Sequence, residues 1–298
     1  MFFTDTNDVI GETNHCFLLG KIGSSMRTRR LIVATVFTAT LLLTSCISFA
    51  QSVHAIVLHD SNQDISHSAE LSCSAIGLSV FGSVPERQLE YSSGAVNRKG
   101  LLDAIDRVRI SAGDSILFYY CGHGYINQKG TPYILPGGGR DPLYLKDILA
   151  RLKRVGAHRT IALFDICQSL RPTIEGRPAP IPPDTISPLF RSILFGEPNG
   201  VPYCVISSAP GEAALAAHFY EGHLAHGSVF SRAFSTVSNE YRNVPLGWRQ
   251  MVQAVTVATS KEFASVKNSK LGVLGDTPVA ALQQTTQTVT EYRPIEIR

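Results

Sequence analysis

Four short stretches of the chain consist of continuous apolar residues instead of alternating apolar and polar ones. Strands buried on both faces of a parallel sheet have this pattern. The sequence therefore predicts four buried strands, at residues 54–59, 115–120, 160–164 and 203–207.

Helical spacing of apolar residues separates these stretches. One stripe precedes the second strand, at Leu101, Leu102, Ile105 and Val108, and another precedes the third, at Leu145, Ile148, Leu149 and Leu152. A third helix is predicted over residues 246–263. Strands that alternate with helices form an α/β sheet, whose ligands bind at the carboxyl ends of the strands.

A proline-rich stretch interrupts this order directly after the third strand. Residues 171–200 hold seven prolines and show no amphipathic period. Proline lacks the backbone donor that a helix or a central strand needs. We therefore expect an exposed loop here.

The N-terminal part has the order of an export signal. Arg27, Arg29 and Arg30 precede residues 31–50, which are uncharged and apolar. Basic, apolar and then small residues are typical of a secretory signal peptide. Cleavage after Ala50 and lipidation of Cys46 at a lipobox-like sequence are both open, and an uncleaved membrane anchor is the third alternative, since about 20 apolar residues span a bilayer.

These features divide the chain into three parts. We expect residues 1–52 to be a leader, with a signal peptide or lipoprotein signal, and residues 53–282, the stretch that the family resemblance described below covers, to be the working domain; residues 283–298 are then a C-terminal tail. We expect the domain to be exported, as a periplasmic or secreted protein or a membrane-anchored lipoprotein. The membrane is contacted only through the signal segment or a lipid on Cys46.

Composition narrows the class of protein. With 44% apolar residues, 17% charged residues and a net charge of +3, the chain is not of the disordered class. Basic and acidic residues are nearly equal in number, so the composition does not indicate the clustered basic face that binds nucleic acid. The six cysteines include no C-x-x-C pair, which leaves zinc knuckles and thioredoxin motifs unsupported; they are Cys16, Cys46, Cys73, Cys121, Cys167 and Cys204.

Two groups with catalytic chemistry follow neighbouring predicted strands. His123 stands between two glycines after the second strand, and Cys167 follows the third. If these strands are parallel neighbours, both residues emerge at one sheet edge. A thiol attacks as thiolate, and an adjacent imidazole favours that form. The amides of Gly124 and Cys167 would then be donors to the oxyanion of an acyl-transfer intermediate.

This pair of segments resembles the caspase-like cysteine peptidases, such as metacaspases and bacterial caspase-like proteins. Residues 122–124 (Gly-His-Gly) look like the family's histidine segment, and Asp165-x-Cys167-x-Ser169 looks like its cysteine segment. Weaker likenesses lie at residues 207–212 and 226–231, and together they cover about residues 53–282. The resemblance implies a caspase-like α/β/α sandwich with a mostly parallel central sheet, with His123 as base and Cys167 as nucleophile in peptide-bond hydrolysis.

Substrate-binding residues are implied by the same resemblance. Asp165 stands two residues before the nucleophile, so that strand alternation points both side chains the same way, and a carboxylate there favours Arg or Lys at the cleavage position. The alternative is that Asp165 caps the following helix or orients His123. The segment that borders the groove supplies Ser207, Ser208 and Ala209, and candidates for a second acid are Asp60, Asp64 and Glu70.

The chain also departs from the family pattern. Gln168 stands where metacaspases usually have His, Leu170 where they have Gly, and Cys121 where they have a small residue. No carboxylate cluster of the kind that binds calcium is visible, so we expect no metal and no cofactor. In the proline-rich loop, Arg191-Ser192 is the expected site of self-cleavage.

Three functions fit these residues. The first is an exported endopeptidase that acts on peptides or proteins. The second is a caspase-fold interaction module that binds partners without turnover. The third is a Cys-His acyl hydrolase, such as a thioesterase or amidase, without a groove for a substrate side chain. The reactivity of Cys167 relative to Cys73 and Cys204 separates the first from the second.

Overall fold

The computed structural model describes most of the chain after its first fifty residues. The described residues are 51–62, 66–168, 193–195, 199–210, 212–214, 216–219, 226–241, 244, 246–268, 272–274, 277–278, 284 and 286–294. They belong to one compact unit, Phe49–Arg298. The expected export signal, the self-cleavage site at Arg191-Ser192, most of the proline-rich loop, Asp64 and Leu170 lie outside the described residues. Among the helices in the described ranges, none has the length and hydropathy to cross a bilayer.

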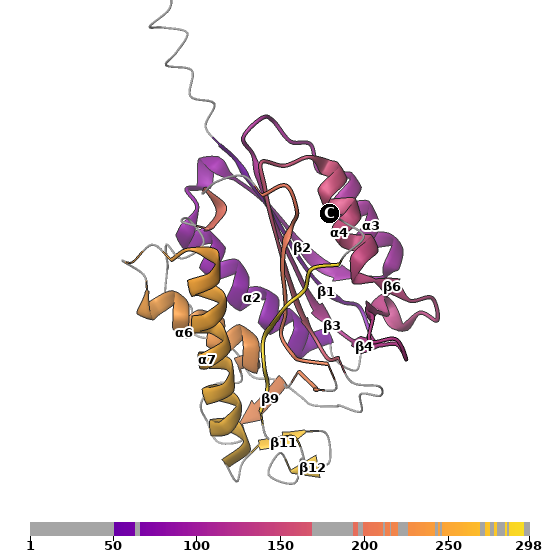
Figure 1. Ribbon diagram of the computed structural model, residues 1–298, viewed down its shortest axis with the longest axis vertical. Coiled ribbons are helices and arrows are strands. Elements are labelled where there is room, and N and C mark those ends of the chain that lie inside the picture. Colours follow the sequence, from indigo (N-terminus) through magenta and orange to yellow (C-terminus); the bar gives the residue numbers. More distant parts are fainter. Residues whose placement is uncertain are drawn as a thin grey trace, which may run out of the picture. The chain divides into compact units, whose positions relative to one another are not determined.

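The centre of the unit is a six-stranded, mostly parallel sheet (Figure 1). All four strands predicted from the apolar stretches are present and pair in parallel as β1, β3, β7 and β8. A polar strand, β2, adds a parallel edge, and β13 adds an antiparallel one. The order across the sheet is β13 (Thr290–Glu291), β8 (Tyr203–Ile206), β7 (Arg159–Ile166), β3 (Ser115–Gly122), β1 (Val53–Asp60) and β2 (Leu89–Val96).

Helices cover both faces of this sheet (Figure 1). One face carries α2 (Ser66–Ser83), α6 (Val229–Glu240) and α7 (Trp248–Asn268). The other carries α3 (Arg98–Asp106) and α4 (Leu145–Val155). The expected α/β/α sandwich with a mostly parallel sheet is thus confirmed.

The smaller elements surround the ends of the strands. A three-stranded antiparallel sheet holds β4 (Gly124–Ile126), β5 (Pro132–Ile134) and β6 (Leu143–Tyr144). Another sheet holds β9 (Ala216–Phe219), β10 (His226–Ser228), β11 (Gly272–Leu274) and β12 (Thr277–Pro278). Two single turns of 3₁₀-helix are η1 (Glu86–Gln88) and η2 (Pro136–Gly138).

Alternation along the central strands divides the interior into two cores. On β7, Ile161 and Leu163 pack with α2, α6 and α7, while Ala162 and Phe164 pack with α3 and α4. Successive side chains of a strand point to opposite faces, so both faces must be apolar where helices cover both. This explains why the predicted strands are continuous apolar runs.

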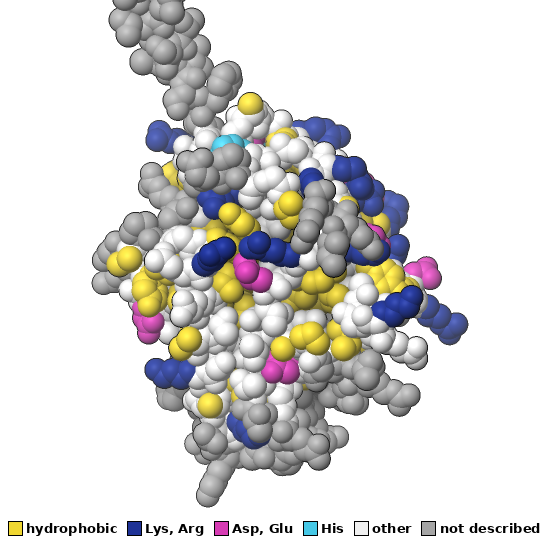
Figure 2. Space-filling model, viewed as in Figure 1, with side chains coloured by type: hydrophobic (Ala, Val, Ile, Leu, Met, Phe, Trp, Pro, Cys, Tyr) yellow, Lys and Arg dark blue, Asp and Glu magenta, His cyan; other side chains and the backbone are white. Residues whose placement is uncertain are grey.

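The helix α4 shows how the outer layer is oriented. Its four predicted stripe residues are fully buried against the sheet: Leu145, Ile148, Leu149 and Leu152. Lys153 and Arg154 on the opposite side are exposed. Lys and Arg side chains are correspondingly more numerous around α4 than in the lower part of the face that Figure 2 shows.

The C-terminal segment differs from its expected role as a separate tail. Thr290 and Glu291 pair with Ile206 and Val205, so residues beyond 282 complete the central sheet. Glu291 also accepts a hydrogen bond from the Trp248 indole of α7. The domain boundary predicted at residue 282 was therefore wrong, because a two-residue edge strand leaves no apolar run in the sequence.

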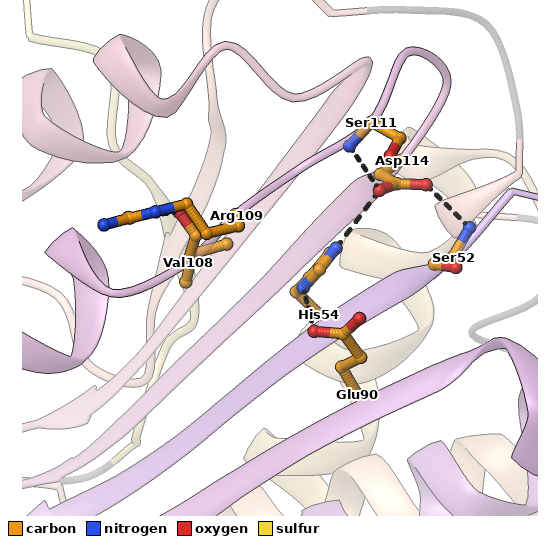
Figure 3. A network of polar contacts seen from close by, with 7 residues as sticks. All are labelled: Ser52, His54, Glu90, Val108, Arg109, Ser111 and Asp114. Atoms are coloured by element: carbon orange, nitrogen blue, oxygen red, sulfur yellow. Dashed lines mark hydrogen bonds and ion pairs between the residues drawn. The ribbon is translucent and has the colours of Figure 1, made fainter.

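A network of polar contacts lies at the amino-terminal end of the sheet (Figure 3). The His54 ring of β1 lies between two carboxylates, with Nε2 3.2 Å from Asp114 Oδ2 and Nδ1 3.0 Å from Glu90 Oε2. Asp114 also accepts hydrogen bonds from the backbone amides of Ser52 (2.9 Å) and Ser111 (2.6 Å). Burial alone would raise the pKa of Asp114, but these amides and His54 lower it below the ordinary value of 3.8.

We expect Asp114→Asn to destabilise the fold by about 1–3 kcal/mol at pH 7, because a buried, charged acceptor of two backbone amides is lost. A lowered carboxyl pKa means that the stabilisation is present above pH 3.8 and is lost as the pH falls below it. The difference from wild type in urea unfolding should therefore shrink at pH 3. Asp103→Asn, which removes an exposed pair with Lys99, is the control and should change little. Equal stability of Asp114→Asn and wild type at pH 7 would contradict the role of this network.

Candidate active site

The register between β3 and β7 determines the geometry of the site. Cys121 pairs with Asp165, and Gly122 pairs with Ile166, at the carboxyl ends of the two strands. His123 directly follows β3, and Cys167 directly follows β7. Neighbouring strands lie about 4.8 Å apart. The two residues predicted as base and nucleophile therefore lie side by side at one edge of the sheet.

His123 is the single residue between β3 and β4 and is half-buried. Its ring lies 6.4 Å from that of Tyr125, which stacks on Tyr133 at 5.4 Å, and Tyr144 continues the row at 5.8 Å. Burial raises the pKa of Tyr125, and repulsion from the ionised forms of Tyr133, Cys167 and Asp60 raises it further. The three tyrosines of the small sheet thus form a row of aromatic rings beside His123.

Gly124 allows the two strand ends to approach each other. A Cβ at this position would lie 2.5 Å from Ile166 Cβ and 2.7 Å from the Cys167 carbonyl oxygen. Because real Cβ contacts are never this short, only glycine fits without a shift of β7. The backbone of Gly124 is therefore packed directly against the carbonyl group of Cys167.

Asp60 binds the backbone amides of His123 and of two further residues. It is fully buried at the end of β1, where Oδ1 accepts hydrogen bonds from Gly137 N (2.7 Å) and Asn62 N (2.9 Å). Oδ2 accepts one from the backbone amide of His123 at 3.4 Å. Both oxygens of this candidate second acid are thus occupied by backbone amides, while Glu70, another candidate, is exposed on α2.

Asp165 lies in β7, two residues before the nucleophile, and is buried. Its carboxylate accepts hydrogen bonds from the Tyr119 hydroxyl (2.9 Å) and from the hydroxyl of Ser228, the residue that caps α6. Burial raises the pKa of Asp165, and these hydrogen bonds oppose the rise. The carboxylate therefore links the nucleophile strand to the start of α6, which begins at Val229.

The segment expected to border the substrate groove supports the nucleophile strand. The side chains of Ser207 and Ser208 are fully buried, and their hydroxyls bond to the backbone of Ile166. The amide of Ala209 donates to Glu212 at 3.0 Å. In this arrangement the two serine side chains contact strand β7 and not solvent.

Gln168, the departure from the family pattern beside the nucleophile, has a structural role. It is buried, and its amide group donates to the Ser208 carbonyl and, at 3.4 Å, to the hydroxyl of Thr290. Its backbone amide donates to the carbonyl of Glu212 at 2.9 Å. Gln168 thus joins the end of β7 to the C-terminal edge strand.

The Cys167 thiol is covered in this arrangement. Only 6% of the residue is exposed, and Sγ lies 3.3 Å from the amide nitrogen of Ala214 and 3.6 Å from its carbonyl oxygen. Burial raises the pKa of Cys167 to about 11; the Ala214 amide opposes the rise, and the charge of Asp165 adds to it. The thiol is thus protonated at neutral pH.

The other described cysteines are also buried, free thiols: Cys73, Cys121 and Cys204. Burial raises the pKa of each well above 9.0. Cys121 packs in the core shared by β3 and α2, as the sequence indicates for a small apolar residue. Across the described ranges, no group of three or more His, Cys, Asp or Glu side chains lies close enough to hold a metal ion.

Sequence reasoning missed the residues that cover and brace the nucleophile. Ala214 contacts Sγ through backbone atoms, and Gln284 binds the backbone of Ala213 from 71 positions away. Backbone contacts leave no residue signature. The acidic Glu212 was visible within the resemblance at residues 207–212, but nothing in the sequence assigned it these partners.

We expect Gly124→Ala to destabilise the fold by about 1–3 kcal/mol, because the added methyl group overpacks the junction with β7. Urea unfolding measures this change. Gly200→Ala is the matched control, since a Cβ there meets nothing within 4 Å. Equal unfolding midpoints for the two variants would show that the strand ends are not as closely packed as described.

Comparison with known proteins places this geometry in a fold class. No family model and no curated protein matches the sequence significantly. Among solved structures, the chain is similar to caspase-1 from Spodoptera frugiperda, with a TM-score of 0.52 and 14% identity over 81% of this chain and 88% of that one. At this identity, the similarity shows the fold alone. The mostly parallel sheet with helices on both faces agrees with it, and the chain has a caspase-like α/β fold.

Proposed function

We propose that this chain is a caspase-like cysteine endopeptidase in which His123 and Cys167 form the catalytic dyad. The observation that carries the proposal is the β3–β7 register, which sets these residues beside each other at the carboxyl edge of the sheet. Ligand sites of α/β sheets lie at this edge. The caspase-like fold supports the same class of reaction.

The proposed reaction needs only groups that this edge supplies. His123 accepts the proton of Cys167 Sγ, and the thiolate attacks the carbonyl carbon of the scissile peptide. The amides of Gly124 and Cys167 donate to the resulting oxyanion. As the C–N bond breaks, His123 returns the proton to the leaving amine, and water then hydrolyses the thioester to release the acid and the free thiol.

Specificity for Arg or Lys is part of the proposal. Asp165 lies in β7, two residues before the nucleophile, and it is a buried acidic group close to the proposed site. A buried carboxylate would attract a basic side chain strongly, because screening by water is weak there. The hydroxyls of Tyr119 and Ser228, which donate hydrogen bonds to Asp165, are neutral and leave its negative charge uncompensated. A basic side chain of the substrate would compensate that charge.

Export of the enzyme belongs to the proposal as well. It rests on the basic-then-apolar order of residues 27–50. Peptides or proteins outside the cytoplasm would then be the substrates.

One observation favours a second function. Cys167 is 6% exposed and its pKa is raised to about 11, which is unusual for a working nucleophile. A caspase-fold interaction module without turnover would have no need of a reactive thiol. A non-peptidase acyl hydrolase shares the dyad and differs in its substrate.

We expect the full chain, under reducing conditions, to cleave fluorogenic peptides that end in Arg or Lys and to ignore those that end in Asp. Cys167→Ala and His123→Ala should each lower kcat/KM by about 1000-fold or more, since they remove the nucleophile and its base. Cys204→Ala, which removes another buried thiol, is the control and should keep activity. Cleavage that survives in Cys167→Ala, or cleavage of thioesters alone, would contradict the peptidase.

Asp165→Asn tests the specificity separately. We expect cleavage after Arg and Lys to fall at least tenfold, because the charge close to the site is lost, while labelling of Cys167 by iodoacetamide continues. Cleavage after Asp in the wild-type chain would keep the mechanism and overturn this assignment.

A further inference from the structure

Residues Glu212–Ala214, called here the covering segment, lie directly on the nucleophile. Both backbone polar atoms of Ala214 contact Cys167 Sγ, the nitrogen at 3.3 Å and the carbonyl oxygen at 3.6 Å. Reacting atoms in a productive complex stand about 3–3.5 Å apart. The Ala214 backbone therefore occupies the space that the carbonyl carbon of a substrate must enter.

Gln284 holds the covering segment from the C-terminal side. Its side-chain oxygen accepts a hydrogen bond from Ala213 N at 2.9 Å, and its side-chain nitrogen donates to Ala213 O at 3.0 Å. One amide group thus satisfies both backbone polar atoms of the residue next to Ala214. The two hydrogen bonds between the Gln284 side chain and the Ala213 backbone are called here the clasp. The carbonyl of Gln284 accepts a hydrogen bond from Lys267 Nζ at 2.5 Å, which links the clasp to α7.

Glu212 holds the other end of the covering segment. Its carboxylate accepts hydrogen bonds from Ala209 N (3.0 Å), Thr288 N (2.7 Å) and Thr288 Oγ1 (3.2 Å). Its carbonyl accepts one from the amide of Gln168, the residue after the nucleophile, at 2.9 Å. The segment is thus held at Glu212 and Ala213, and the next residue, Ala214, makes the two backbone contacts to the thiol.

We infer that Gln284 is a positioning residue that seats Ala213 and Ala214 over the Cys167 thiol, and that this arrangement is a latent form of the site. The inference rests on the proposed function in that a substrate peptide has to displace the covering segment before attack. Release of the clasp also exposes the Cys167 thiol to water. Latency and low thiol reactivity therefore have one cause.

The clasp predicts how reactivity changes when it is removed. Gln284→Ala removes the two hydrogen bonds to Ala213, which only the covered form makes, and also the hydrogen bond from Gln284 Nε2 to the Thr286 carbonyl (2.7 Å), which does not involve the covering segment. A typical hydrogen bond contributes about fivefold to an equilibrium, so the uncovered population should rise roughly 10- to 100-fold. Gln284→Glu keeps the acceptor for Ala213 N but places a carboxylate oxygen against the carbonyls of Ala213 and Thr286, so it should also raise the uncovered population.

Site-resolved alkylation of the full reduced chain tests this inference. Iodoacetamide is added over a range of pH, and each cysteine is followed by mass spectrometry. In wild type, a thiol of pKa about 11 is ionised in roughly one molecule in a thousand at pH 8, so Cys167 should react slowly. In Gln284→Ala, Cys167 should react roughly 10- to 100-fold faster, with its pH midpoint moved from about 11 towards the ordinary 9.0.

Controls separate this effect from general loosening of the fold. Gln253→Ala, which changes an exposed glutamine of α7, should leave the rate at Cys167 unchanged. The rates at Cys73 and Cys204 should stay at wild-type values in every variant. Unchanged alkylation of Cys167 in Gln284→Ala, or equal acceleration at all three cysteines, would overturn the inference.

The outcome is distinguishable from a failure of the proposed function. Faster alkylation of Cys167 in Gln284→Ala, without cleavage of any peptide, supports the clasp and contradicts the peptidase. Peptide cleavage by wild type, with no change of alkylation or cleavage in Gln284→Ala, supports the peptidase and overturns the clasp.

Discussion

The parallel pairing of β3 with β7 is the constraint on which the rest of the site depends. Both strands end at the same edge, and their last paired residues are Gly122 and Ile166. A shift of one residue would turn every side chain of β7 to the opposite face. The apolar cores on both faces prevent that shift, since each face of β7 packs against its own set of helices. The cores thus hold His123 and Cys167 together.

The two ends of the sheet treat their polar groups in different ways. At the amino end, His54 lies between two carboxylates, and backbone amides satisfy Asp114. At the carboxyl end, Asp60 has the same structural task, because its oxygens are occupied by three backbone amides. The thiol of Cys167 is instead held by contacts to one short segment. A change confined to that segment would alter the chemistry of the thiol without unfolding the sheet.

The sequence predicted the parts of the fold whose burial is uniform. Continuous apolar runs give β1, β3, β7 and β8, and a clear stripe gives α4. The long helix α2 was missed because its buried side carries serines, among them Ser79 and Ser83. Their hydroxyls donate to backbone carbonyls one turn earlier, at 3.1 and 2.7 Å. Polar residues that satisfy themselves in this way erase the amphipathic pattern.

The candidate site divides along a similar line. His123 and Cys167 were visible because each follows an apolar strand and each has a side chain with known chemistry. The burial of Ser207 and Ser208 was not visible in the sequence, since a serine hydroxyl can either line a groove or form a supporting hydrogen bond in the interior. Contacts between backbone atoms distant in sequence, as at Ala214, depend on the whole fold and carry no local signal.

The most direct test of the dyad is labelling by a peptide that ends in Arg and carries a thiol-reactive ketone. Mass spectrometry identifies the labelled residue, and the rate is followed against reagent concentration. The account predicts that Cys167 alone is labelled, that the rate saturates, and that His123→Ala lowers the maximal rate by about 100-fold or more. A rate that never saturates and is equal in wild type and His123→Ala would contradict it.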